Sequence, residues 1–200
     1  MTRKAGVWNI PTMALWEVFL SDATGDELRK SLQEVRYMPR STVEQWVQRK
    51  NKMVEPDQIF MGFGVGGRTG ARVIELRKKM LKGLHEAGAR IALGTDSPQV
   101  FSVPGFSIHR EIQAMGALGF TSFEVLQSGT RSVAEYFGTL AETGTVETGK
   151  RADLILLEAN PLASLSNLER RAGVMVRGRW IPEREIQERL EKLAAAASKL

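Results

Sequence analysis

One carboxylate occupies the position where an α/β chain carries reactive groups. Asp96 ends the stretch Arg90-Ile91-Ala92-Leu93-Gly94-Thr95-Asp96, and Ser97-Pro98 follows it. A short apolar run that turn residues interrupt predicts a buried parallel strand. Residues at the C-terminal tips of parallel barrel strands face the reaction site. A carboxylate there can accept a proton from an attacking water or cap the turn before Pro98, and spacing alone favours neither interpretation.

His109 and Arg68 are the other side chains that we expect to contact a substrate. His109 lies at the start of a predicted helix, after the loop that follows Asp96. The alternative for His109 is a helix-start histidine that donates a hydrogen bond to a loop carbonyl. Arg68, together with Arg72, can bind a substrate carboxylate bidentately, or both can remain solvated at a helix start. His85 lies in the middle of a predicted outer helix, where we expect a structural role.

A glycine-rich stretch precedes the longest predicted helix. Gly62-Phe63-Gly64-Val65-Gly66-Gly67 matches the Gly-x-Gly-x-x-Gly pattern by count. That pattern binds a dinucleotide only between a strand and a helix, with an acidic residue about 20 positions further on. Only Gln58 to Met61 precedes it here, which is too short for such a strand. We therefore expect a loop near the mouth of the active site that acts as a substrate lid.

The composition is that of a globular chain of one domain or slightly more. Hydrophobic residues make up 42% of the 200 residues and charged residues 26%, and cysteine is absent. The first two values allow a sizeable core. The lack of cysteine excludes a disulfide framework and thiolate metal sites, and it fits a cytoplasmic location. We expect no membrane partner, because no apolar run approaches the roughly 20 residues of a membrane span.

The net charge of +5 does not by itself predict a nucleic-acid partner. Cations alternate with carboxylates, as in Glu27-Leu28-Arg29-Lys30, which is typical of a solvated helix face. The densest basic cluster, Arg77-Lys78-Lys79 with Lys82, contains no aromatic residue. Charge alone supplies only the non-specific part of nucleic-acid recognition. We therefore expect no nucleic acid among the partners.

Alternating helical and strand patterns predict the α/β class in the first two thirds of the chain. Capping residues are expected at Thr24 and again near Ser41-Thr42, where Glu44 completes a candidate capping box. The predicted strands are 7–12 and 90–96. The predicted helical stretches are 22–53 with one break, 73–87, 111–118, 122–129 and 131–137.

The pattern changes to short strands after residue 138. Strands are predicted at 144–146 and 152–158, and a hairpin at 174–181 around Gly178. Pro182 then opens an amphipathic C-terminal helix.

Several motifs in a fixed order resemble the amidohydrolase superfamily, in particular its imidazolonepropionase-like and prolidase-like members. The motifs are Gly94-Thr95-Asp96-Ser97-Pro98, Gly119-Phe120-Thr121, Thr130 to Ala134 with Gly138, Gly144-Thr145-Val146, Gly149-Lys150-Arg151-Ala152-Asp153-Leu154, Asn160-Pro161-Leu162 and Val176-Arg177-Gly178. The resemblance implies the C-terminal part of a metal-dependent hydrolase (β/α)8 TIM barrel for residues 1–141. It implies return strands of a small composite β-sandwich for 142–182, followed by the helix at 183–200.

The resemblance also implies hydrolysis of a carbon–nitrogen bond in a small amide, cyclic amide or dipeptide by metal-activated water. Asp96 matches the family's metal-ligating aspartate at the end of the last barrel strand, where it also acts as general base. The metal is divalent, with Zn²⁺ expected. The family's other ligands are a His-x-His pair, a lysine or glutamate and two later histidines, whereas this chain has two histidines in other places.

Two hypotheses about function follow. In the first, the chain is a C-terminal portion of such a hydrolase, inactive in isolation because most metal ligands are missing. In the second, it is a non-catalytic fragment or assembly partner that requires a complementary N-terminal half. Exposed strand edges would then lead it to self-associate.

Overall fold

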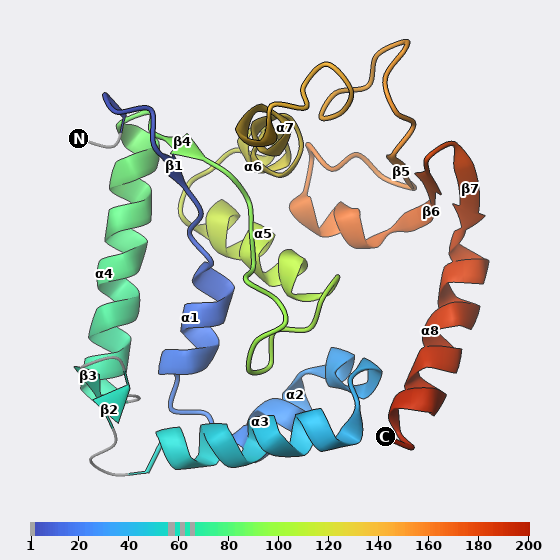
Figure 1. Cartoon of the computed structure of the whole chain (residues 1–200). Coiled ribbons are helices and arrows are strands. Elements are labelled where there is room, and N and C mark those ends of the chain that lie inside the picture. The colour runs from blue at the N-terminus through green and yellow to red at the C-terminus, as the bar shows by residue number, and fades with distance from the viewer. Residues whose placement is uncertain (1–2, 56–58, 61–62, 65–66) are drawn as a thin grey trace. The chain divides into compact units, whose positions relative to one another are not determined.

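The computed structural model describes residues 3–55, 59–60, 63–64 and 67–200, and it mixes helices with strands (Figure 1). The helices are α1 (Met13–Leu20), α2 (Gly25–Ser31), the 3₁₀ helix η1 (Gln33–Tyr37), α3 (Arg40–Met53), α4 (Gly67–Glu86), α5 (Ser107–Ala117), α6 (Ser122–Gly129), α7 (Arg131–Phe137), the 3₁₀ helix η2 (Leu165–Glu169) and α8 (Glu183–Ala197). The strands are β1 (Trp8–Asn9), β2 (Ile59–Phe60), β3 (Phe63–Gly64), β4 (Arg90–Ile91), β5 (Leu154–Leu157), β6 (Arg171–Val176) and β7 (Arg179–Pro182).

The chain divides into two compact units, each built from several segments. The first unit contains Met1–Pro11, Leu81–Gly94 and His109–Arg189, and the second contains Thr12–Met80, Thr95–Ile108 and Leu190–Leu200. The domain boundaries predicted at 141/142 and 182/183 stay predictions. No helix within the described residues has both the length and the apolar character needed to cross a membrane.

A short parallel pair of strands lies in the first unit. β1 pairs with β4 in the register Trp8 to Arg90 and Asn9 to Ile91. The amide of Ala92 then donates to the Asn9 carbonyl at 3.0 Å, and the amide of Leu93 to the Ser128 carbonyl at 3.0 Å. The structure thus confirms that Asp96 follows a strand of a parallel pair, although both strands are shorter than the sequence predicts.

Helices α6 and α7 have the bounds that the sequence predicts, because local capping residues determine where α6 begins and where α7 ends. Thr121 accepts a hydrogen bond from the amide of Glu124, and Glu124 accepts one from the amide of Thr121, which forms a capping box at the start of α6. Gly138 ends α7 in the left-handed region with φ 68°, a conformation that glycine adopts without strain.

Strands β5, β6 and β7 form an antiparallel sheet in that order. The predicted hairpin is confirmed, with Arg177 and Gly178 at positive φ in its turn. The predicted strand at Gly144–Val146 is wrong. Gly144 lies close to Ala134 with φ 91°, and Val146 is 83% exposed. The segment therefore runs along α7 and lacks the paired backbone that defines a strand.

The second unit has an apolar core built from α1, α2, α3 and the loop before α5. Phe101 is completely buried and its ring lies 5.7 Å from that of Trp46. Helix α1, with the sequence Met-Ala-Leu-Trp-Glu-Val-Phe-Leu, buries most of its side chains. The sequence analysis missed this helix, because a helix that is apolar on most sides shows no helical periodicity.

One of the two predicted caps in this unit is confirmed. Thr24 and Glu27 form a capping box at the start of α2. The capping box predicted at Ser41-Thr42 with Glu44 is wrong, because α3 begins at Arg40 directly after Pro39 and no side chain caps it. The Glu44 carboxylate instead accepts from Arg40 Nε at 2.8 Å, one helical turn away.

Candidate functional site

Asp96 lies in the loop that follows β4, in the second unit. Its backbone adopts φ 56°, in the left-handed region that aspartate tolerates better than most residues. The side chain is exposed. No hydrogen bond or ion pair joins its carboxylate to another residue in the part of the chain that the structure describes, so the alternative role as a turn cap has no contact to support it.

The hydroxyl groups on either side of Asp96 form a compact cluster. Ser97 Oγ lies 3.0 Å from Thr95 Oγ1, 2.9 Å from Ser102 Oγ and 2.6 Å from Ser107 Oγ. Ser102 and Ser107 are buried, at 2% and 1% exposure. Both chain neighbours of Asp96 are therefore anchored to the protein interior, while the carboxylate itself remains open to solvent. The arrangement leaves this carboxylate available to a ligand or to a water molecule.

His109 lies in the first turn of α5, as the sequence predicts, and belongs to the first unit. It is half-buried, and burial lowers the pKa of its imidazole. The negative charge of Glu169 opposes that shift and the positive charge of Arg171 adds to it. The predicted contact of His109 with substrate stays a prediction, since Asp96 belongs to the other unit.

Arg68 lies in the first turn of α4, and its side chain is outside the described residues. Half of the glycine-rich stretch 62–67 also falls outside them, because residues 62, 65 and 66 are not described. The predicted lid and the predicted contact of Arg68 with substrate therefore stay predictions. Arg72 is exposed on the same helix.

His85 makes its side-chain contacts within the first unit. His85 Nε2 lies 3.1 Å from Glu124 Oε1, and its ring stacks on Phe120 with centroids 3.9 Å apart. This is the structural role expected for it. The pKa of Glu124 is lowered to about 2, mainly by the hydrogen bond from the Thr121 backbone and then by the one from His85.

The donor set for a metal ion is incomplete. Among the described residues, no group of three or more histidine, aspartate or glutamate side chains converges to hold a metal. A catalytic zinc ion takes three protein ligands and a water molecule. Asp96 contributes one carboxylate, so the described residues do not by themselves fit a metal ion.

The sequence analysis missed a buried lysine in the second unit. Lys50 is fully buried, and its Nζ donates to the carbonyls of Phe19 at 3.1 Å and Ser21 at 2.8 Å. Burial lowers its pKa to about 8. The signal was present in the sequence, because Lys50 falls on the same helical stripe as Val43 and Val47.

Comparison with known proteins identifies the family of the chain. Residues 40–181, more than half of the chain, match the model of the amidohydrolase family. The chain belongs to the amidohydrolase family. The match ends at Ile181, in the last strand of the antiparallel sheet, so the loop of Asp96 and all of that sheet except Pro182 lie within the matched region.

Two curated relatives show how much of such proteins the chain covers. The imidazolonepropionase of Agrobacterium fabrum is 39% identical over 98 residues, which are 45% of this chain and 22% of the relative. The 5-methylthioadenosine/S-adenosylhomocysteine deaminase of Caldanaerobacter subterraneus subsp. tengcongensis is 28% identical over 164 residues, which are 78% of this chain and 31% of the relative. The chain therefore spans less than a third of the length of either relative.

The solved structure supports the fold. Bottromycin amidohydrolase superposes with a TM-score of 0.72 at 23% identity, over 96% of this chain and 40% of that protein. At this identity the likeness shows the fold alone. It agrees with the mixture of helices and sheet described above.

Proposed function

We propose that the chain contributes Asp96 to the active site of a hydrolase that acts on a carbon–nitrogen bond of a small amide, cyclic amide or dipeptide. Membership of the amidohydrolase family and the names of the two curated relatives support this class of substrate. In this proposal residues 1–141 form a C-terminal segment of a TIM barrel, and residues 142–182 form return strands of a β-sandwich.

The position of Asp96 is the observation that carries the proposal. The hydroxyl cluster anchors the residues on both sides of it, and its carboxylate is left exposed without a partner among the described residues. A carboxylate held in this way can take a proton from an attacking water molecule. It can then pass that proton to the leaving nitrogen, which is the work of a general base followed by a general acid.

The family is typically metal-dependent, and we propose a divalent ion, Zn²⁺ first, for the complete enzyme. Because the described residues supply one carboxylate, the other ligands would come from a complementary N-terminal half. His109 and Arg68 are the proposed substrate contacts, Arg68 through its planar guanidinium on a substrate carboxylate.

The test is complementation of the purified chain. The chain is co-expressed with the part of the Agrobacterium fabrum imidazolonepropionase that lies outside the matched segment. Zinc content and hydrolysis of amide, cyclic amide and dipeptide substrates are then measured. We expect the complex to bind zinc and to hydrolyse one of these classes, and Asp96→Asn to lower turnover by at least about a hundredfold, the usual size of a general-base contribution.

The matched control is Glu86→Gln at the end of α4, which should leave turnover unchanged. Turnover that survives Asp96→Asn in a complex with normal zinc content would remove Asp96 from the mechanism. If the two parts assemble and bind zinc but none of the substrates is hydrolysed, the proposed activity is wrong.

A second candidate function is favoured by exposed apolar residues in the sheet of the first unit. Leu154, Ile155 and Leu156 are 37%, 61% and 56% exposed in β5, an outer strand of that sheet. An exposed apolar edge strand is a template for pairing with another chain. We infer that the chain can act as a non-catalytic assembly partner. Sedimentation of the isolated chain over a range of concentrations tests this, and a monomer with a sharp melting transition at all concentrations would contradict it.

A further inference from the structure

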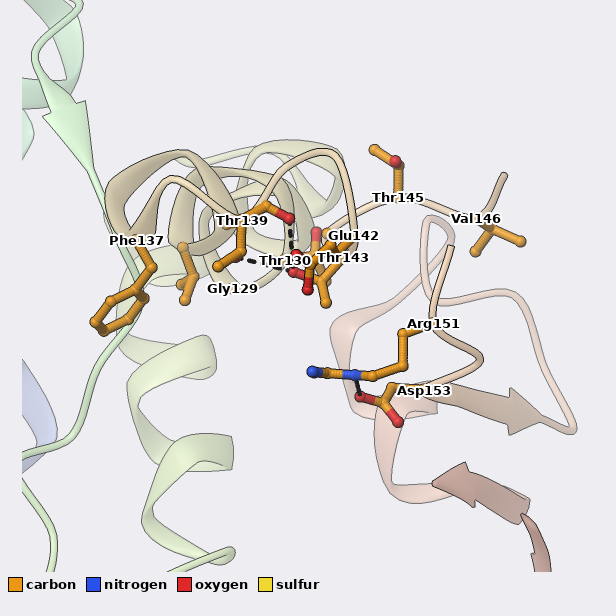
Figure 2. A pocket seen from close by; sticks show the side chains of 13 residues that line it. Gly129, Thr130, Phe137, Thr139, Glu142, Thr143, Thr145, Val146, Arg151 and Asp153 are labelled. Atoms are coloured by element: carbon orange, nitrogen blue, oxygen red, sulfur yellow. Dashed lines mark hydrogen bonds and ion pairs between the residues drawn. The ribbon is translucent and has the colours of Figure 1, made fainter. Parts of the chain in front are cut away.

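A cavity of about 680 Å³ lies within the first unit, away from the loop of Asp96 in the sequence. Its walls come from the corner between α6 and α7, from the loop at 139–146 and from the segment that leads into β5 (Figure 2). Every lining residue is among those that the structure describes, and all of them belong to the same compact unit. The cavity plays no part in the proposed hydrolysis.

The cavity combines an apolar surface with a row of hydroxyl groups. Val133, Phe137 and Val146 are among the lining residues, and Phe137 and Val146 are 69% and 83% exposed. Thr139 Oγ1 and Thr143 Oγ1 lie 3.1 Å apart on the wall formed by the loop. Apolar groups that stay in contact with water at a concave surface gain free energy when a ligand covers them.

Two opposite charges enter this cavity from adjacent positions. The amide of Arg151 donates to the carbonyl of Glu142 at 2.9 Å, so the two backbones lie side by side. Both side chains line the cavity, yet they form no ion pair with each other. Within the described residues, the Glu142 carboxylate has neither a hydrogen-bond donor nor a cation as partner.

The guanidinium of Arg151 is held in place by one of its three nitrogens. Arg151 Nε donates to Asp153 Oδ2 at 2.5 Å, and Asp153 Oδ1 in turn accepts from the amide of Arg177 at 2.7 Å. Figure 2 shows the guanidinium reaching into the cavity, with Asp153 on one side of it and Glu142 on the other. The two terminal nitrogens of Arg151 form no hydrogen bond or ion pair with a described residue. They are therefore available for a bidentate contact with a carboxylate.

We propose that this cavity binds a free amino acid with an apolar side chain. The ligand carboxylate binds the terminal nitrogens of Arg151, and the ligand ammonium group binds the carboxylate of Glu142. The side chain covers part of the apolar lining, which Val133, Phe137 and Val146 provide. A zwitterion offers a carboxylate to the terminal nitrogens of Arg151 and an ammonium group to Glu142, and a cavity of about 680 Å³ also admits the side chain. Because the site is open to solvent, which weakens each ion pair, we expect dissociation constants of about a millimolar.

The test compares three ligands that differ by one charged group. The full chain, labelled with ¹⁵N, is titrated with L-leucine, with 4-methylpentanoate, which lacks the ammonium group, and with 3-methylbutylamine, which lacks the carboxylate. Amide shifts at residues 129–153 report the binding. We expect leucine to bind about threefold to fivefold more tightly than either analogue, because an ion pair that is open to solvent contributes a change of this size.

Two variants assign the charges and a third is the control. Arg151→Gln should reduce the affinity for leucine to that for 3-methylbutylamine, whose own affinity should not change. Glu142→Gln should reduce the affinity for leucine to the affinity for 4-methylpentanoate. Arg184→Gln, an exposed arginine on α8 that pairs only with Glu188 at 3.6 Å among the described residues, should have no effect.

Equal affinity for the three ligands would overturn the proposal, and so would the absence of shifts at residues 129–153 with leucine at tens of millimolar. If a variant loses the dispersion of its amide spectrum, it has not folded, and the three-ligand comparison on the unaltered chain then decides the question. The titration does not depend on any hydrolytic activity, so it can fail while the proposed function stands, or succeed while that function fails.

Discussion

The buried ammonium group of Lys50 shows what a single residue contributes to this fold. Its Nζ donates to the carbonyls of Phe19 and Ser21, which would otherwise lie in the apolar core without this donor. Burial disfavours the charged form, and the pKa falls from 10.5 to about 8. The lysine therefore satisfies backbone acceptors at the cost of a desolvated charge.

This pKa predicts a pH dependence of stability with a definite sign. Between about pH 8 and pH 10.5 the folded chain has released the proton and the unfolded chain still binds it. Unfolding then takes up a proton, so raising the pH across this window stabilises the folded chain, by about 3 kcal/mol in total. Below pH 8 both states are protonated and the dependence vanishes. Urea unfolding at pH 7, 8, 9 and 10 measures it.

Lys50→Met should abolish this rise, whereas Lys52→Met, at an exposed position on the same helix, should keep it. The other titrating groups contribute equally to both variants and cancel in the comparison. Equal slopes in the two variants would show that Lys50 does not titrate in this window.

At the residue scale, the sequence predicted the position of Asp96 but not the buried serines that anchor its neighbour Ser97. A carboxylate after an apolar strand is visible in the order of the residues. The contact of Ser97 with Ser107 is not, because it joins positions that the loop brings together. Lys50 was missed for a different reason. A lysine within an apolar stripe is usually expected to extend its ammonium group into solvent. Only tertiary packing brings the carbonyls of Phe19 and Ser21 to the ammonium group of Lys50.

At the scale of elements, local signals decided which predictions were right. α6 and α7 have the predicted bounds because a capping threonine and a left-handed glycine act within a few residues. α1 and the segment at Gly144–Val146 were predicted wrongly or not at all. In both, the deciding contacts are tertiary: the core that buries α1 on most sides, and Ala134 of α7 beside Gly144.

The capping box at the start of α6 provides a test at this scale. Thr121→Ala removes the side-chain acceptor for the amide of Glu124 and one donor to its carboxylate. We expect a loss of about 1 kcal/mol in the free energy of unfolding, measured by urea unfolding at pH 7. Ser122→Ala, at the next position, should change it by much less. A loss in both variants alike would mean that something other than the cap is responsible, because alanine itself favours the helix.

For the molecule as a whole, the family could be predicted from the order of short motifs, and the arrangement of the candidate site could not. Asp96 and His109 are close in sequence, yet they belong to different compact units. A loop of a few residues says nothing about which unit each of its ends packs against. That depends on long-range contacts, such as those of Phe101 in one core and of His109 near Glu169 in the other unit.

The sheet of the first unit predicts that the whole chain self-associates. β5 is an outer strand, and the four residues Leu154–Leu157 contain no charge, proline or glycine that would discourage pairing. Natural edge strands avoid pairing with such charges, above all with lysine. Ile155→Lys introduces one at the most exposed position of the strand. We expect this variant to raise the concentration at which the chain associates by at least about tenfold, in sedimentation velocity at 0.15 M salt.

The control for this prediction is Leu193→Lys on α8, which is also an exposed apolar residue, at 48% exposure, but does not lie on a strand edge. Both variants add the same charge, so a general gain in solubility affects them equally. Strand pairing requires the change at Ile155 alone to matter, because only there does the new ammonium group lie beside unpaired backbone groups. If Leu193→Lys has the same effect, association is driven by net charge or by apolar surface in general. The assembly role inferred from β5 would then lose its support, while a role for Asp96 in hydrolysis would be unaffected.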